Sequence, residues 1–324
     1  MEIADKNWIA TSPKLLPDFI IGGAMKCGTT TLHDILNAHP DVFIPPREIH
    51  FFDMDNILQH PDFNNHKSDE WICQFLHQEP QKFWEWYTSH YSGRTESVLG
   101  EDSTTYLASP TAARRIAAQE KDIKLIFLLR NPTERAFSQY IHDLRKGRMT
   151  HSFEDTLRFH PHTVLARSMY SSQLIKYYRQ IPMHRIHIIV FEEFIKNQEN
   201  TIREVCDFLE IDFSKIPTER FETHSNLAKM PWSTTLQYLK NRLVRNMGNK
   251  NYGSYLPNSP NTFKFKDIPS ALVHYVHTGI NPPLFSTKPT MKEPTKEFLN
   301  NYFKTHLHNL DAITGKDILQ HWFD

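Results

Sequence analysis

Short apolar runs alternate with segments of helical periodicity along the first two thirds of the chain. The apolar runs, which are typical of buried β-strands, lie at residues 18–22, 41–44, 97–100, 123–129 and 186–191. Apolar residues recur at helical spacing in segments 31–38, 80–89, 111–119, 132–146, 170–179 and 200–209. Because strand and helix alternate, the pattern predicts an α/β fold with a central parallel sheet flanked by helices.

One run and the last third of the chain refine this picture. Residues 123–129 are apolar almost throughout, as a central parallel strand buried on both faces is. Residues 226–290 contain much Pro, Asn and Tyr and little periodicity, so we expect a cap or acceptor loops there. A final helix is predicted at residues 294–310. The sequence has no internal repeat, and its 324 residues suit one α/β domain over residues 1–324.

Composition and charge narrow the classes of partner. Lys plus Arg and Asp plus Glu each total 37, so no net field favours nucleic acid, and an anionic ligand needs a local cluster of cations. Three cysteines are too few and too scattered for a disulfide framework. Neither a signal peptide nor an apolar run long enough to span a membrane is visible. We therefore expect a cytoplasmic protein without a membrane span, and its oligomeric state stays open.

A loop rich in glycine and threonine follows the first predicted strand and leads into the first predicted helix. Gly28 precedes Thr29, Thr30 and Thr31, and Lys26 lies inside the loop. Glycine frees backbone N–H groups to face an anion, and the hydroxyls and the positive end of the helix dipole add to the attraction. The loop is therefore a candidate phosphate site, and a ligand-free turn between strand and helix is the alternative.

The loop departs from the Walker A pattern at one informative position. Residues 23–30 match G-x-x-x-x-G-K-[ST], except that Thr29 stands where that pattern has lysine. The lysine of this loop is Lys26, before the second glycine. The departure argues against a P-loop nucleotide kinase or NTPase, which remains an alternative function.

The end of the strand at 123–129 gives a second test of that alternative. A kinase or NTPase needs Mg²⁺, usually held by an aspartate after a buried strand. Here the strand is followed by Arg130, and Ser138 lies on the predicted helix after it. A guanidinium and a hydroxyl suit an additional phosphate better than a metal. The alternative pairs Arg130 with a nearby carboxylate such as Glu134.

A charged segment after the second predicted strand supplies candidates for proton transfer. If the segment is extended, Glu48, His50 and Phe52 share one face, so Glu48 or His50 could take a proton from an acceptor. The alternative is a solvated pair of Arg47 with Glu48 and a His50 that packs in the core. Other histidines, among them His60, lack metal-ligand spacing and are assigned to the surface or the core.

Together these motifs resemble the PAPS-dependent sulfotransferases, specifically the group that includes bacterial tailoring enzymes and heparan sulfate sulfotransferases. The resemblance covers most of the chain and rests on segments 22–36, 46–52, 100–106, 125–140, 170–174, 188–209 and 310–322. It implies a single domain with a P-loop-kinase-like parallel sheet. It also implies PAPS (3′-phosphoadenosine-5′-phosphosulfate) as the donor, PAP as the product, and no metal.

Carried over by position, the resemblance assigns the donor site. It implies that the 5′-phosphosulfate is held by the loop residues Lys26, Gly28, Thr29, Thr30 and Thr31. The family has its loop lysine before the glycine, as this chain does.

The resemblance also assigns the 3′-phosphate and the base. It implies that Arg130 and Ser138 hold the 3′-phosphate, that Glu48 is the base and that His50 lines the same site, as helper or alternative base. The family often adds a further cation from the C-terminal third. The candidates here are Lys250, Lys264, Lys266 and Lys288, and the sequence gives no basis for choosing among them.

Two departures from the heparan-type pattern bear on the acceptor. Those enzymes usually have lysine where Arg47 and Asp102 stand in this chain. Asp102 reverses the charge, which argues against an anionic polysaccharide, while the neighbouring Glu101, Ser103 and Tyr106 are expected to brace the site. The acceptor class stays open among small molecules, lipids or polyketides, and carbohydrates. A third hypothesis, an inactive PAP-binding protein, conflicts with the intact set of candidate residues.

Overall fold

The computed structural model describes residues 6–60, 64–67, 70–73, 80–221, 230–245, 275–284 and 289–323. The chain divides into two compact units. The first comprises Met1–Pro132, Met169–Ser225 and Phe303–Asp324, and the second comprises Thr133–Ser168 and Asn226–Tyr302. The expectation of one domain over 1–324 stays a prediction. Within the described ranges, none of the helices has the length and apolar character that a membrane crossing requires.

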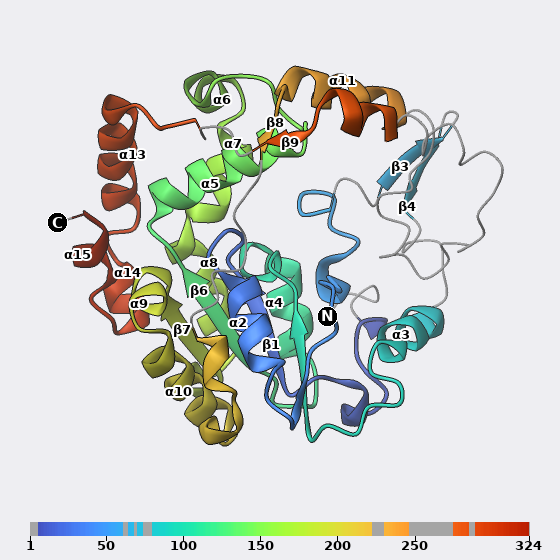
Figure 1. Ribbon diagram of the computed structural model, residues 1–324. Coiled ribbons are helices and arrows are strands. Elements are labelled where there is room, and N and C mark those ends of the chain that lie inside the picture. The colour runs from blue at the N-terminus through green and yellow to red at the C-terminus, as the bar shows by residue number, and fades with distance from the viewer. Residues whose placement is uncertain are drawn as a thin grey trace. The chain divides into compact units, whose positions relative to one another are not determined.

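The first unit is built on a five-stranded sheet in the order β2-β5-β1-β6-β7. Figure 1 labels three of its strands, β1, β6 and β7. Its strands are β1 (Phe19–Gly23), β2 (Val42–Phe43), β5 (Val98–Asp102), β6 (Lys124–Leu129) and β7 (Ile186–Val190). All four neighbouring pairs are parallel, which confirms the predicted sheet. β6 lies between β1 and β7, and every residue of it after Lys124 is buried, as the apolar run predicts.

Helices flank this sheet and begin where the sequence provides caps. The α-helices of the first unit are α2 (Thr29–Leu36), α3 (Pro80–Ser89), α4 (Pro110–Ala117), α8 (Tyr170–Tyr178), α9 (Phe191–Lys196), α10 (Gln198–Leu209), α14 (Leu310–Thr314) and α15 (Ile318–Phe323). α4 is an example of N-terminal capping: Ser109 Oγ accepts a hydrogen bond from Ala112 N, and Pro110 occupies the first turn. The buried face of α10, with Ile202, Val205 and Leu209, is the predicted apolar face.

Short elements connect these helices and strands. The 3₁₀ helices of the first unit are η1 (Pro13–Leu15), η2 (Phe51–Asp53), η5 (Tyr106–Ala108), η7 (Met183–Arg185), η8 (Phe213–Lys215) and η9 (Thr218–Arg220). An antiparallel hairpin joins β3 (Asn64–Lys67) to β4 (Glu70–Cys73).

The second unit is largely helical in its described residues. It contains most of α5 (Pro132–Arg145), α6 (Phe153–Phe159), α7 (Pro161–Leu165), η6 (Ala166–Ser168), α11 (Thr234–Arg245) and most of α13 (Glu293–His306). β8 (Met230–Pro231) pairs antiparallel with β9 (Pro283–Leu284). The segment 226–290, predicted as cap or loops, thus includes the helix α11, and much of the rest lies outside the described residues.

We expect the buried His187 on β7 to make the free energy of unfolding depend on pH. Its ring stacks on Phe208 with the centroids 5.1 Å apart, and its Nε2 is buried without a hydrogen-bond partner among the described residues. Burial, with a smaller contribution from Lys316, lowers the pKa of His187 to about 4. The pKa of His187 is lower in the folded protein than in the unfolded chain. The neutral His187 side chain therefore contributes stability at neutral pH, and this contribution is lost as the pH falls towards 4.

We expect His187→Phe to flatten the acid dependence of folding. Between pH 7 and pH 4.5, the free energy of unfolding should fall by about 2 kcal/mol less in the variant than in the wild type. Urea unfolding of both proteins at the two pH values measures this difference. Equal losses in the two proteins would show that His187 is not buried in its neutral form.

Candidate active site

The loop between β1 and α2 is shaped by two glycines with positive φ. Gly28 has φ 88° and caps α2, and its carbonyl accepts hydrogen bonds from Thr31 N and Leu32 N. Gly23 has φ 129°, and a Cβ there would lie 2.6 Å from Thr104 O. Only glycine tolerates both positions without strain, so the chain folds back tightly here. The result is a loop whose backbone N–H groups gather at a helix N-terminus, the arrangement that suits phosphate.

The residues predicted to contact phosphate occupy this loop and the first turn of α2. Lys26 is half-buried and Thr29 is buried, whereas Thr30 is exposed and Thr31 is half-buried. Cys27 between them is fully buried and its Sγ lies 3.8 Å from Tyr170 Oη, which fits a small packing residue.

Backbone strain marks two of the predicted site residues. Lys26 has φ 69° and His50 has φ 57°; with Glu210 they are the non-glycine residues of positive φ within the described ranges. Such conformations cost about 1–3 kcal/mol each and persist where the surroundings impose them, often at functional sites. The sequence gives no direct signal for either conformation.

Arg130 lies against the phosphate loop. It follows β6, and its Nη1 donates a hydrogen bond of 3.4 Å to Lys26 O. The guanidinium lies over the Phe191 ring at 4.9 Å, and Tyr170 Oη donates to Arg130 O at 2.9 Å. The carboxyl ends of β1 and β6 therefore bring together the loop lysine and the arginine, as expected for adjacent parallel strands.

Two parts of the predicted 3′-phosphate site stay predictions. Ser138 is half-buried on α5 and belongs to the second unit, whose placement relative to the first is not determined. Lys250, Lys264, Lys266 and Lys288 lie outside the described residues.

Glu48 and His50 meet, but not by the predicted route. The segment is not an extended strand: His50 adopts a left-handed conformation and begins the 3₁₀ helix η2, which contains Phe52. The condition under which Glu48, His50 and Phe52 would share one face, an extended segment, is therefore not met. The turn at His50 instead brings its Nε2 to 3.1 Å from Glu48 Oε2, while Phe52 is fully buried.

The Glu48 carboxylate is held on one side and accessible on the other. Thr104 Oγ1 donates to Glu48 Oε2 at 2.7 Å, and Thr104 N donates to the same oxygen at 3.3 Å. The His50 contact also uses Oε2, and the Glu48 side chain is 37% exposed. Among the described residues these contacts leave Oε1 available, so the carboxylate can accept a proton from a bound molecule.

A buried network braces the backbone of His50. His50 N donates to Ser103 Oγ at 2.8 Å, and Ser103 Oγ donates to Glu101 Oε1 at 2.7 Å. Tyr106 Oη and Tyr87 Oη also donate to Glu101, at 2.5 and 2.6 Å. Burial raises the pKa of Glu101, and these three hydrogen bonds oppose the rise. Glu101, Ser103 and Tyr106 thus have the bracing role expected from the sequence.

Asp102 does not present its charge as the sequence argument assumed. It is 5% exposed, and its Oδ2 lies 3.2 Å from His33 Nδ1 on α2. Burial and the nearby charge of Glu48 raise its pKa, while the His33 hydrogen bond lowers it. Because Asp102 is enclosed, its carboxylate does not meet a bound acceptor directly, whereas the sequence argument assumed that it would.

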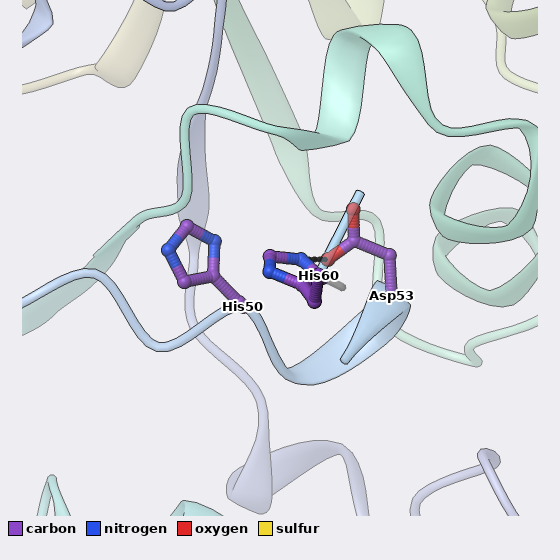
Figure 2. A group of neighbouring side chains, drawn as sticks. All are labelled: His50, Asp53 and His60. Atoms are coloured by element: carbon purple, nitrogen blue, oxygen red, sulfur yellow. Dashed lines mark hydrogen bonds and ion pairs between the residues drawn. The ribbon is translucent and has the colours of Figure 1, made fainter. Parts of the chain in front are cut away.

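The structure adds two residues that the sequence analysis did not assign to the site. His60 Nε2 lies 2.7 Å from Asp53 Oδ1, and the rings of His60 and His50 have centroids 4.6 Å apart. Figure 2 shows the His60 ring next to the Asp53 carboxylate and facing the His50 ring. His60 is buried, in keeping with its assignment to the surface or the core, and His50, Asp53 and His60 offer ligand atoms within 4.8 Å of one another.

Comparison with known proteins decides the family. A model of the sulfotransferase domain matches residues 16–261, which is most of the chain. The chain belongs to the sulfotransferase family. The match includes the phosphate loop, the Glu48–His50 segment and Arg130.

Curated relatives match this chain over part of their length. Heparan sulfate glucosamine 3-O-sulfotransferase 5 of Mus musculus is 28% identical over 208 residues, which are 60% of this chain and 54% of the relative. The bifunctional heparan sulfate N-deacetylase/N-sulfotransferase 1 of Caenorhabditis briggsae is 36% identical over 138 residues, 41% of this chain and 13% of the relative. The chain thus spans about half, or much less, of the length of these relatives.

A solved structure matches this chain over nearly its whole length. The sulfotransferase from Alicyclobacillus acidocaldarius has a TM-score of 0.62 and 24% identity, covering 95% of this chain and 98% of that one. The fold is therefore the sulfotransferase fold, with the P-loop-like junction of β1 and α2 that the sequence predicted.

Proposed function

We propose that the protein transfers the sulfuryl group of PAPS to a hydroxyl or amine of an acceptor and releases PAP. The observation that carries the proposal is the contact between the Lys26 loop and Arg130 at the carboxyl ends of two neighbouring strands. This arrangement offers two cations and a helix N-terminus to a nucleotide with two separate anionic groups.

The donor would be divided between the loop and the arginine. Lys26, Gly28, Thr29, Thr30 and Thr31 would hold the 5′-phosphosulfate with backbone N–H groups, hydroxyls and one ammonium group. Arg130 would hold the 3′-phosphate, and Ser138 would add a hydroxyl donor. Family membership supports PAPS as the donor.

The transfer needs positioning, a base and a cation. The acceptor oxygen or nitrogen attacks the sulfur in line as the bond from sulfur to the bridging phosphate oxygen breaks. Glu48 takes the acceptor proton, and Lys26 stabilises the negative charge that develops on the departing phosphate of PAP. His50, at 3.1 Å from Glu48, orients that carboxylate and is the alternative base. The proposal assigns no metal to this step.

Carbohydrates are the first acceptor class to test. The curated relatives that match this chain are named for heparan sulfate, a carbohydrate acceptor. Asp102 is buried, so its carboxylate makes no direct contact with such an acceptor. Small molecules and lipids or polyketides should be screened as acceptors beside carbohydrates, because the fold does not determine the acceptor.

Calorimetric titration with PAP tests the donor site before any acceptor is known. We expect PAP to bind without metal and much more tightly than AMP or ADP with Mg²⁺. Preference for ADP with Mg²⁺ would overturn the proposal in favour of a nucleotide kinase. Tight PAP binding without turnover of PAPS across the acceptor screen would favour an inactive PAP-binding protein.

Arg130→Ala should weaken PAP binding selectively. Loss of a charge-assisted contact to the 3′-phosphate should lower PAP affinity by about 10- to 100-fold. The affinity for AMP, which lacks that phosphate, should hardly change. Arg203→Ala is the matched control, because Arg203 is an exposed arginine on α10 paired only with Glu199 among the ion pairs of the described residues. Equal losses for PAP and AMP would show that Arg130 does not recognise the 3′-phosphate.

A further inference from the structure

His50, Asp53 and His60 form a compact group of ligand atoms. Each residue offers one nitrogen or oxygen within 4.8 Å of the others. The Asp53 side chain is fully buried and that of His60 is 7% exposed, so water competes little for these atoms. Two imidazoles and one carboxylate are a common donor set for zinc and other divalent transition metals.

Thr105 shows that the spacing suits a small cation. Its Oγ1 lies 3.1 Å from His50 Nδ1, 3.3 Å from Asp53 Oδ1 and 3.4 Å from His60 Nε2. Metal–ligand bonds of about 2.0–2.1 Å in a tetrahedral site place neighbouring ligand atoms about 3.3–3.4 Å apart. The pair formed by Asp53 Oδ1 and His60 Nε2, now 2.7 Å apart, would have to open by a little over half an ångström, about the scale of ordinary side-chain adjustment.

The contact between Glu48 and His50 is the second indication of a metal site. A histidine that binds a metal through one nitrogen usually donates its other ring N–H to a carboxylate, which fixes its tautomer. His50 has this arrangement: its Nδ1 faces Thr105 and the cluster, and its Nε2 lies 3.1 Å from Glu48 Oε2.

The local charge also favours a cation. Asp53 Oδ2 is buried without a hydrogen-bond partner among the described residues. The Asp53 charge helps to raise the pKa of the buried Glu101, although burial is the larger cause. Buried carboxylates close to each other are stabilised by a metal ion or by protons.

We propose that His50, Asp53 and His60 bind a divalent transition-metal ion, with Zn²⁺ as its simplest occupant. Thr105 Oγ1 or water completes the coordination. The ion would regulate the candidate base, and this part rests on the proposed function. With Nδ1 on the metal, the His50 ring is held in place with its Nε2 on Glu48 Oε2, so the carboxylate turns less freely towards an acceptor. Metal binding should therefore inhibit sulfuryl transfer.

Cobalt binding tests the site without reference to activity. Co²⁺ is titrated into tag-free, metal-stripped protein, and its visible d–d absorption reports the coordination geometry. We expect the wild type to bind one Co²⁺ with the intense bands of a four-coordinate ion, and Zn²⁺ to displace it. His60→Gln, whose amide can still donate to Asp53, should lower this affinity by about 100-fold or more, since losing a ligand exceeds the loss of an outer partner.

Two further variants control this experiment. His187→Phe removes a histidine of the same unit outside the cluster and should bind Co²⁺ as the wild type does. Asp53→Asn is an independent ligand variant of nearly the same shape, in case His60→Gln does not fold. Identical Co²⁺ affinities and spectra in the wild type and in the folded ligand variants would overturn the metal site.

The proposed inhibition by metal is tested separately, by measuring turnover in the presence of Zn²⁺. With an acceptor from the screen, Zn²⁺ should slow turnover of the wild type at concentrations that hardly affect His60→Gln, each measured against its own metal-free rate. Equal inhibition of the two proteins by Zn²⁺ would refute the regulation. The cobalt titration would still decide whether the metal site exists. Failure of PAP to bind would refute the proposed function and leave the cobalt result unaffected.

Discussion

Glu48→Gln is expected to abolish most turnover while leaving PAP binding unchanged. Glutamine keeps the shape of the side chain and can still contact Thr104 and His50, but it cannot accept the acceptor proton. Loss of a general base costs about 10²- to 10⁴-fold in rate. Sulfuryl transfer from labelled PAPS measures this loss, and calorimetry with PAP shows whether the donor site is intact.

Thr104→Val is the matched variant for this experiment. It removes the hydrogen bond from Oγ1 to Glu48 but leaves the carboxylate and its contact with His50 in place. We expect a loss of about 10-fold or less, because a misoriented base is still a base. Normal turnover in Glu48→Gln would reject Glu48 and make His50 the candidate, to be tested by His50→Gln. Losses of equal size in Glu48→Gln and Thr104→Val would point to a positioning role for Glu48.

The sheet and the phosphate loop were predictable because few physical requirements determine them. A parallel strand covered on both faces must be apolar, as β6 is, and a tight loop with positive φ at Gly23 and Gly28 requires glycine. Once β1 and β6 are taken as adjacent, their carboxyl ends meet, which explains the contact of Lys26 with Arg130.

The second half of the site was not predictable, because it depends on one backbone turn and on distant contacts. A positive φ such as that of His50 is uncommon for any residue other than glycine, so an extended segment was the simpler expectation. That turn brings Asp53 and His60 towards His50. The burial of Asp102 depends on His33, which is far away in sequence.

The helix α11 lies in the segment predicted as a cap or loops, and its signal was present in the sequence. Leu236, Leu239 and Leu243 recur at helical spacing within Thr234–Arg245. The many prolines, asparagines and tyrosines elsewhere in 226–290 obscured this helical spacing.

Lys26→Ala is expected to reduce turnover by about 10²- to 10³-fold, the loss typical of removing one donor from charge that develops in a transition state. The lysine lies in the phosphate loop next to Arg130, and its left-handed backbone, at φ 69°, fixes the direction in which the side chain leaves the loop. The main loss should fall on kcat, because the negative charge on the departing phosphate grows as the sulfur–oxygen bond breaks. PAP should bind about 10-fold more weakly, since other loop contacts remain.

The comparison of Lys26→Ala with Lys26→Arg separates charge from geometry. Alanine and lysine have the same Cβ, so the alanine variant adds no steric obstacle at this left-handed residue. If charge alone matters, Lys26→Arg should recover much of kcat; if the position of a compact ammonium matters, it should recover little. Lys196→Ala, at an exposed end of α9, controls for the loss of a lysine elsewhere. A higher KM for PAPS with unchanged kcat in Lys26→Ala would mean that Lys26 binds donor and transition state equally, and would refute its role on the leaving group.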